Sequence, residues 1–540
     1  MQSKENAANE FAMPLLRVGG FVLRLGKLIS IIVTCLPSSR GSAPERFRMF
    51  FERAGGAFLK LGQILAMRQD FLPLEYTDEL LDLFSRVPEE GWERMAEVFR
   101  LERGERPETF FASITTRPIA SASIGQVYRA TMKDGRDVAV KIARPEVEVA
   151  FENDFILAGF LGEIIGIFTF SKALPIQDVV SEFVSSTRAE LDFRNEAHNA
   201  DLLAKHAAFH NGVVIPKPLL ECSGKHVLIM EYLDRILSGE TALRELVVGG
   251  NDYRNKLRKE GIDLDEVAYL FVIDGVRQYF IDGFFHADPH PGNIFFLPGN
   301  KVGFFDFGLV GRASLRRIHN AKILYALAQR DVYGASKHLI TYARETFSVE
   351  LELYRAAGNA LDDKYELILS KIEEIMIDNF ALDLEAILRP WYDEVDKEVG
   401  VVLSRQELRK RSSSIVFAHI VMAAERYDIV LPRETTLFLR TIAISDMVAL
   451  RLNPRFDMMK AFQRFFHEFP LARLEEMGGE HEKAIKEEGE IVVPTGETYE
   501  AMMELKLQNE ERLGVAKERL AELVFYYAEQ YPEIRALLKG

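Results

Sequence analysis

The sequence predicts a bilobal α+β protein, in which a strand-rich lobe is followed by a helix-rich lobe. From Pro118 onward, apolar and polar residues alternate on both sides of an Asp134-Gly135 turn, a pattern typical of an antiparallel hairpin. Beyond Asp234 the apolar residues follow a helical period, apart from one irregular run at 286–308. A cleft where two such lobes join is a common place for a ligand site.

The chain divides into four segments by composition and periodicity. We expect a helical N-terminal extension over 1–110, a strand-rich lobe over 111–233, a helix-rich lobe over 234–470 and a helical tail over 471–540. With 540 residues and 48% hydrophobic content, the chain is long enough for more than one buried core.

Charge and cysteine content exclude several classes of protein. The net charge of −15 argues against a sequence-independent nucleic-acid binder, so we expect no nucleic-acid partner. The two cysteines, Cys35 and Cys222, lie far apart and outside any CxxC pair. This pattern predicts neither a disulfide framework nor a structural zinc site, and it fits a reducing compartment.

Two apolar stretches are too short and too charged to cross a membrane, which takes about 20 apolar residues. Phe21–Pro37 contains Arg24 and Lys27, and Phe155–Phe170 contains Glu163. The first residues, MQSKENAANE, are polar and do not resemble a signal peptide. We therefore expect a cytoplasmic protein without a transmembrane segment. The first apolar stretch is a candidate for peripheral membrane contact, and a core or dimer helix is the alternative.

The strand-rich lobe begins with the hairpin around Asp134-Gly135, and we expect its strands at 126–131 and 137–142. Pro145 blocks continuation of the second strand, and helical periodicity returns until about His206.

Two further hairpins are expected. The segment 213–233 should form a strand pair around Ser223-Gly224, and the irregular run 286–308 should turn at Pro298-Gly299-Asn300. The rest of the chain is expected to be helical, including a last helical region at 499–538.

Four polar residues occur in the order and spacing that phosphoryl transfer requires. Lys141 ends the apolar run VAVK, a context in which a lysine on a strand can reach the phosphates of a nucleotide. Asp288 and Asn293 lie five apart, as a catalytic aspartate and a metal-binding asparagine do in kinases. Asp306 heads a DFG triplet and would face the same metal. Each motif alone is weak, but together and in order they predict a protein-kinase-like fold that binds ATP and Mg²⁺.

A transition-metal site is the alternative for part of this region. His286, Asp288 and His290 would converge on a metal if they shared a helical face. Pro289 and Pro291 oppose such a helix, so His286 is better explained as the histidine that opens a kinase catalytic loop.

The expected nucleotide pocket has an unusual phosphate loop. Only one glycine, Gly125, stands where kinases have a GxGxxG pattern, and alanine and serine restrict the backbone more than glycine does. A plain turn before a strand is the alternative for this segment. We expect the nucleotide to contact Ala120, Ser121, Ala122, Ser123, Ile124, Gly125 and Val127 of the loop and its strand, Ala139 and Lys141 of the next strand, and Met230, Glu231, Tyr232 and Leu233 of the hinge.

Together with these motifs, other segments of the sequence resemble the UbiB-type family of atypical kinases. Lys60-Leu61-Gly62-Gln63 matches the family's KxGQ motif, and Glu190-Leu191-Asp192 resembles its ExD motif. Glu196 matches the glutamate that pairs with the strand lysine, here Lys141. The loop 120–123 looks like the family's alanine-rich loop, with Ser121 in place of a usual alanine.

The resemblance extends over about Phe47–Phe456 and includes Leu431-Pro432 and Leu452-Asn453-Pro454. The chain departs from many members at Asn453, where aspartate is frequent, and in its last residues, which are too charged to span a membrane. The resemblance implies a regulatory role for Lys60, Gln63, Glu190 and Asp192, with Lys60 meeting Glu190 or Asp192 over the cleft.

The same resemblance implies the function. We expect an Mg²⁺-dependent ATPase or a small-molecule or lipid phosphotransferase, with Asp288, Lys141 and Glu196 as catalytic residues and Asn293 and Asp306 at the metal. Its expected partners are the nucleotide and a lipid or isoprenoid quinone precursor, and the sequence leaves the oligomeric state open. A protein kinase and a nucleotide-binding scaffold without turnover are the alternatives. The KxGQ extension and the glycine-poor loop argue against the first, and the full set of metal-binding residues argues against the second.

Overall fold

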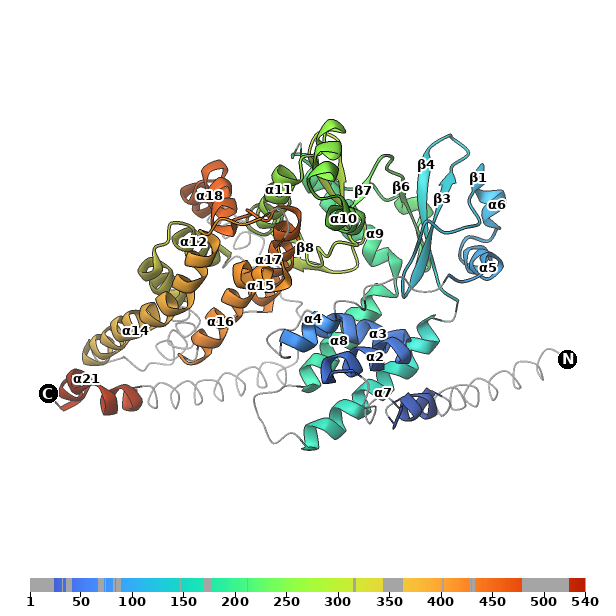
Figure 1. Ribbon diagram of the computed structural model, residues 1–540. Helices are drawn as coiled ribbons and strands as arrows, with labels where there is room; N and C mark the ends of the chain where they lie inside the picture. The colour runs from blue at the N-terminus through green and yellow to red at the C-terminus, as the bar shows by residue number, and fades with distance from the viewer. Residues whose placement is uncertain are drawn as a thin grey trace, which may run out of the picture. The chain divides into compact units, whose positions relative to one another are not determined.

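The computed structural model divides into two compact units (Figure 1). The first unit contains 1–241 and 291–310, and the second contains 242–290 and 311–540. The structure describes residues 24–31, 33–34, 41–66, 72, 74–80, 83, 89–145, 147–168, 176–210, 212–313, 317–342, 363–400, 403–427, 429, 433–477 and 524–539. The expected four-segment division stays a prediction. Cys35 and Leu431-Pro432 lie outside the described residues.

An antiparallel sheet forms the core of the strand-rich part of the first unit. Its strands are β1 (Ser113–Ile114), β2 (Ala120–Ser121), β3 (Gly125–Thr131), β4 (Asp137–Ala143) and β6 (Val227–Glu231). The order is β1-β3-β4-β6, with β2 paired to the start of β3. The expected hairpin around Asp134-Gly135 is confirmed, and Gly135 has the positive φ that such a turn needs.

Alternation along β4 gives the sheet two different faces. Val138, Val140 and Ile142 are buried in an apolar cluster with Met95 and Phe99 of α5 (Trp92–Arg103). Because successive side chains point to opposite faces, Ala139 and Lys141 face the other way. Lys141 therefore lies on the face of the sheet opposite to this apolar cluster.

A second sheet has the order β5-β10-β9-β7 and corrects one expectation. Its strands are β5 (Val213–Val214), β10 (Lys301–Phe304), β9 (Ile294–Leu297) and β7 (Leu237–Ser238). The hairpin at Gly299 is confirmed, since β9 and β10 pair antiparallel. The strand pair expected around Ser223-Gly224 is formed only in part, because β5 pairs in parallel with β10 and β6 pairs with β4. Residues 217–219 still pair antiparallel with 229–231 through backbone hydrogen bonds and an isolated bridge at Pro218. The physical reason for the short pairing is Pro216 and Pro218, which cannot donate to a ladder.

Helices from the N-terminal extension pack against helices of the lobe within the first unit (Figure 1). The bounds are α2 (Ala43–Ala54), α3 (Gly56–Ala66), α4 (Leu74–Leu80), α6 (Pro107–Phe110), α7 (Val147–Phe168), α8 (Ile176–Glu190), α9 (Phe193–Ala207) and the 3₁₀ turn η2 (Leu220–Cys222). One apolar cluster joins them, with Phe51 and Phe58 of the extension against Phe151 and Phe155 of α7. Arg24 fixes this arrangement by donating to both carboxylate oxygens of Asp154, at 2.5 and 2.8 Å.

The second unit is mainly helical. Its elements are α10 (Gly239–Lys259, which begins in the first unit), α11 (Leu264–Arg277), the π turn η3 (Gln278–Asp282), β8 (Phe284–His286), β11 (Val310–Arg312), α12 (Arg317–Ala328), α14 (Asp363–Val395), α15 (Arg405–Arg411), α16 (Ser413–Glu425), α17 (Arg433–Leu452), α18 (Met458–Glu468) and α21 (Pro532–Lys539). Tyr279 stacks on Phe438 of α17 with ring centroids 3.8 Å apart, which holds η3 against that helix.

No helix in the described ranges combines the length and the apolar character needed to cross a membrane.

Candidate nucleotide and metal site

A lysine and a glutamate form the centre of the site in the first unit. Lys141 on β4 donates to both carboxylate oxygens of Glu196 on α9, at 2.8 and 2.7 Å. It also lies 3.4 Å from Oδ2 of Asp306. The pairing of Lys141 with Glu196 is thus formed as expected, and the two side chains are only 13% and 4% exposed.

Burial and charge set the ionisation of this pair. Burial alone would lower the pKa of Lys141, but the Asp306 and Glu196 carboxylates outweigh it and hold that pKa above its ordinary value. Burial raises the pKa of Glu196 to about 7, although Lys141 acts against this shift. The lysine therefore stays positively charged at neutral pH, as a phosphate-binding group must.

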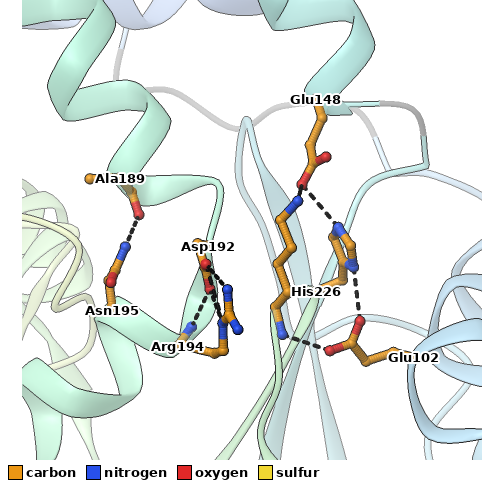
Figure 2. Close-up of polar contacts among 8 residues, drawn as sticks. Glu102, Glu148, Ala189, Asp192, Arg194, Asn195 and His226 are labelled. Atoms are coloured by element: carbon orange, nitrogen blue, oxygen red, sulfur yellow. Dashed lines mark hydrogen bonds and ion pairs between the residues drawn. The ribbon is translucent and has the colours of Figure 1, made fainter.

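The start of α9 is anchored from two sides, which fixes the position of Glu196. Phe193 N–H donates to the carbonyl of Lys225, and the Lys225 ammonium lies 2.7 Å from Glu148 on α7. Figure 2 shows His226 between two carboxylates, with its ring nitrogens 2.9 Å from Glu102 and 3.0 Å from Glu148. Helices α5, α7 and α9 are therefore tied together at the edge of the sheet.

The DFG segment is held by α9 through both backbone polar groups of Phe307. Phe307 N–H donates to the Glu196 carboxylate, and the Asn199 side chain donates to the Phe307 carbonyl at 2.9 Å. Asp306 Oδ1 accepts from Gly308 N–H, also at 2.9 Å. Sequence analysis missed Asn199; its place one helical turn after Glu196 is the pattern that could have indicated it.

The N-terminal extension reaches this segment through one ion pair. Lys60 of α3 lies 3.0 Å from Glu190 at the end of α8, which confirms that contact. The Glu190 side chain in turn packs on Gly308, where an added Cβ would lie 3.2 Å from Glu190 Cγ. A Cβ at this position would also lie 3.1 Å from Asp306 Oδ1, so both side chains would have to shift slightly.

The other residues of the two motifs have different contacts. Asp192 caps α9 and forms an ion pair with Arg194, as Figure 2 shows. Gln63 donates to the Leu83 carbonyl at 3.0 Å rather than to a carboxylate. Gly62 permits close packing, because a Cβ there would come within 2.6 Å of Leu83 Cδ1.

The glycine-poor loop forms a tight turn between β2 and β3. Ala120 pairs with Val127, Ser121 pairs with Gln126, and Ala122 N–H donates to the Gly125 carbonyl at 2.9 Å. A Cβ at Gly125 would lie 2.7 Å from the Ile142 carbonyl, so this glycine serves close approach of β3 to β4. Its φ is not positive, unlike those of many turn glycines.

The hinge begins with the last two residues of β6, Met230 and Glu231, and Met230 is buried and pairs with Ala139. Two hinge N–H groups are already used: Glu231 donates to Lys217 at 2.8 Å and Tyr232 donates to Asp137 at 3.1 Å. The Tyr232 N–H is therefore not available to adenine in this arrangement, which leaves Leu233 as the hinge residue to test.

The two remaining motif residues fall in different compact units. Asn293 lies in the first unit, just before β9, and its carbonyl accepts from Phe305 N–H at 2.8 Å. The β9–β10 hairpin thereby carries Asn293 and Asp306 at the same end. Asp288 lies in the second unit, where its N–H donates to His286 Nδ1 at 3.3 Å and its carboxylate is 3.8 Å from His290.

Asn293 and Asp306 offer an amide oxygen and a carboxylate, the hard oxygen ligands that Mg²⁺ prefers. Bound there, the ion would neutralise charge on nucleotide phosphates. Among the described residues, no group of three or more histidine, cysteine or acidic side chains is arranged to hold a metal.

A small cavity in the second unit has no such chemistry. It has a volume of about 50 Å³ and lies among α12, α14, α16 and α17, lined by side chains such as Leu324, Phe380 and Phe417. The side-chain amide of Asn320, which also lines the cavity, donates to the hydroxyl groups of Tyr279 and Thr435. A cavity without an acid, a base or a cation cannot hold the phosphate chemistry.

Comparisons with known proteins agree with the geometry. The model of the ABC1 atypical kinase-like domain matches residues 82–339. The chain is 31% identical over 325 residues to the Uncharacterized protein slr0889 of Synechocystis sp., a match covering 58% of this chain and 75% of that protein. It is 33% identical over 247 residues to Protein ACTIVITY OF BC1 COMPLEX KINASE 1, chloroplastic, of Arabidopsis thaliana, covering 45% of this chain and 34% of the plant protein.

Among solved structures, the complex of Rv3197 with erythromycin from Mycobacterium tuberculosis aligns with a TM-score of 0.44 and 22% identity, over 75% of this chain and 90% of that chain. The family model and the plant relative agree with the resemblance to UbiB-type kinases, and the family model agrees with the mixed helix and strand content of the described residues. The chain belongs to the ABC1 atypical kinase-like family.

Proposed function

We propose that this chain is an Mg²⁺-dependent ATPase or a small-molecule phosphotransferase that serves lipid or isoprenoid quinone metabolism. The observation that carries the proposal is the buried Lys141–Glu196 pair beside Asp306, with Asn293 on the same hairpin as Asp306. A charged lysine next to hard oxygen ligands suits the phosphates and the metal of a bound nucleotide. Asp288 would orient the attacking group.

A small acceptor is favoured over a protein by the contact between the extension and the DFG segment. Lys60 of α3 pairs with Glu190, and Glu190 in turn packs on Gly308 of the DFG segment. These two contacts connect α3 to the segment that carries Asp306. Removing one partner of a largely buried ion pair is costly, so α3 should stay in place during turnover. A protein substrate would have to displace it.

The proposal is tested with purified full-length chain, MgATP and radiolabelled γ-phosphate. We expect Mg²⁺-dependent binding and slow release of phosphate, and transfer to a small molecule when lipid extract is added. Asp306→Asn is the inactive control, and Asp134→Asn, in an exposed turn, is the matched surface control. Absence of nucleotide binding would overturn the proposal, and label found on added proteins but on no small molecule would favour a protein kinase.

A further inference from the structure

Arg144, the residue directly after β4, forms hydrogen bonds to the glycine-poor loop. Arg144 Nε donates to the Ala122 carbonyl at 2.9 Å, and Arg144 Nη2 donates to Ser121 Oγ at 2.8 Å. Its backbone N–H also donates to the Ile124 carbonyl at 2.8 Å. Arg144 thus binds three residues of the loop, and it lies only three positions after Lys141.

The guanidinium group suits this task. It is planar and presents several N–H donors in a rigid fork, so it can hold acceptors on two neighbouring residues at once. Burial lowers the pKa of Arg144, with Glu90 and Tyr128 acting in the opposite direction. The ordinary pKa of arginine is so high that the group remains charged at neutral pH.

With Arg144 bound to the loop, some backbone N–H groups of the loop have no acceptor in the part of the chain that the structure describes. Ala122 N–H is already used within the turn, on Gly125. Among the residues that the structure describes, the N–H groups of Ser123 and Ile124 have no hydrogen-bond acceptor. Backbone N–H groups at a turn are suitable ligands for phosphate.

We infer that Arg144 is a positioning residue that holds the 120–125 loop in the shape in which Ser123 and Ile124 present their N–H groups to nucleotide phosphates. This inference rests on the proposed nucleotide-binding function. A loop of alanine and serine has less backbone freedom than a loop of glycines, so it must be held in the right shape beforehand. Arg144 acts on the phosphates through the loop and does not touch them.

The test separates phosphate recognition from adenosine recognition. Dissociation constants of MgADP and of adenosine are measured by calorimetry for the wild type, Arg144→Gln, Ser121→Ala and the double variant. We expect Arg144→Gln to weaken MgADP about tenfold, equal to about 1.4 kcal/mol, and to leave adenosine unchanged. Ser121→Ala should weaken MgADP about threefold, and the double variant should equal Arg144→Gln, because both changes break the same contact.

Arg136→Gln is the matched control, since Arg136 is an exposed arginine of the β3–β4 turn that pairs with Asp134. It should change neither constant. Equal losses for MgADP and adenosine, or no loss, would overturn the inference. So would a loss in Arg144→Gln that Ser121→Ala does not share, since that pattern indicates direct contact with phosphate. If Arg144→Gln does not fold, Ser121→Ala alone decides through its MgADP constant. A wild-type chain that binds neither ligand would instead contradict the proposed function.

Discussion

Two buried carboxylates, one in each compact unit, look alike until their partners are compared. Glu196 of α9 and Asp446 of α17 are 3% and 1% exposed, and burial raises the pKa of each to about 7. Glu196 faces the ammonium of Lys141 and the Asp306 carboxylate. Asp446 accepts from the Ser412 hydroxyl at 2.9 Å and the Ser413 N–H at 2.6 Å, at the start of α16.

The difference teaches that a raised pKa does not by itself identify a reacting group. Neutral donors that satisfy a carboxylate at a helix start are a structural arrangement. Around Glu196, by contrast, a cation and a second carboxylate provide charged groups that can bind a charged ligand. Four predictions test this contrast, in order of decreasing expected effect.

The largest effect is expected from Lys141→Met, which leaves Glu196 buried without its cation. The free energy of unfolding should fall by about 4 kcal/mol at pH 8, as is usual when one partner of a buried pair is removed. Without the lysine, the pKa of Glu196 rises further, so the folded variant binds a proton that the unfolded chain releases. Its stability must then decrease as pH rises above the ordinary glutamate pKa, and the loss at pH 5.5 should be smaller.

Urea unfolding at both pH values measures this change. Lys205→Met is the control. Lys205 lies on α9, the helix that carries Glu196, but it pairs with Asp201 at the surface. Equal losses for the two variants would show that the Lys141–Glu196 pair is no more important than a surface ion pair.

Asp306→Asn should weaken MgADP at least about a hundredfold, equal to about 2.7 kcal/mol, because an amide cannot replace the charge of a metal-binding carboxylate. Its effect on stability should be small, since the Asp306 side chain is 41% exposed. Calorimetry with and without Mg²⁺ measures the constants. An unchanged constant in the presence of Mg²⁺ would remove Asp306 from the metal site.

Asp446→Asn should change how stability depends on pH. The folded pKa of about 7 lies above the unfolded value, so the folded state keeps a proton that the unfolded chain loses. Asp446 therefore lowers the stability of the native protein by about 1.4 kcal/mol per pH unit between its unfolded and folded pKa values, on the order of 2.5 kcal/mol between pH 5 and pH 7. This contribution should vanish in the variant, whereas the contribution of Glu196 in the same pH range should remain. Thermal unfolding at pH 5 and pH 8 measures it, and nucleotide affinity should not change. The same pH slope in both proteins would contradict the assignment.

Asn199→Ala should have the smallest effect, about 1 kcal/mol of stability, from one lost hydrogen bond to the Phe307 carbonyl. It should also weaken MgADP severalfold, because the DFG segment loses a support. Asn195→Ala is the matched control: Asn195 lies on the same helix but donates to the Ala189 carbonyl at 2.9 Å, as Figure 2 shows, and not to Phe307. Calorimetry that finds equal MgADP constants for the two variants would exclude a role for Asn199 in positioning.

Local pattern in the sequence was enough for the elements that depend on near neighbours. Alternation around Asp134-Gly135 predicted the β3–β4 hairpin, and the turn at Gly299 predicted β9 and β10, because hairpins are set by adjacent residues. The order of Lys141, Asn293 and Asp306 indicated the chemistry, since residue type and spacing restrict the ligands that a metal and phosphates can have. Glu196 and Lys60 needed the family resemblance.

Only the tertiary structure decided which distant segments meet. It paired β5 with β10 instead of β6, and it brought Arg144 to the 120–125 loop and Asn199 to Phe307. These contacts join residues more than 20 positions apart, and no periodicity in the chain records them. Register between distant strands and the reach of a long side chain depend on how the whole core packs, and that is settled only when the chain has folded.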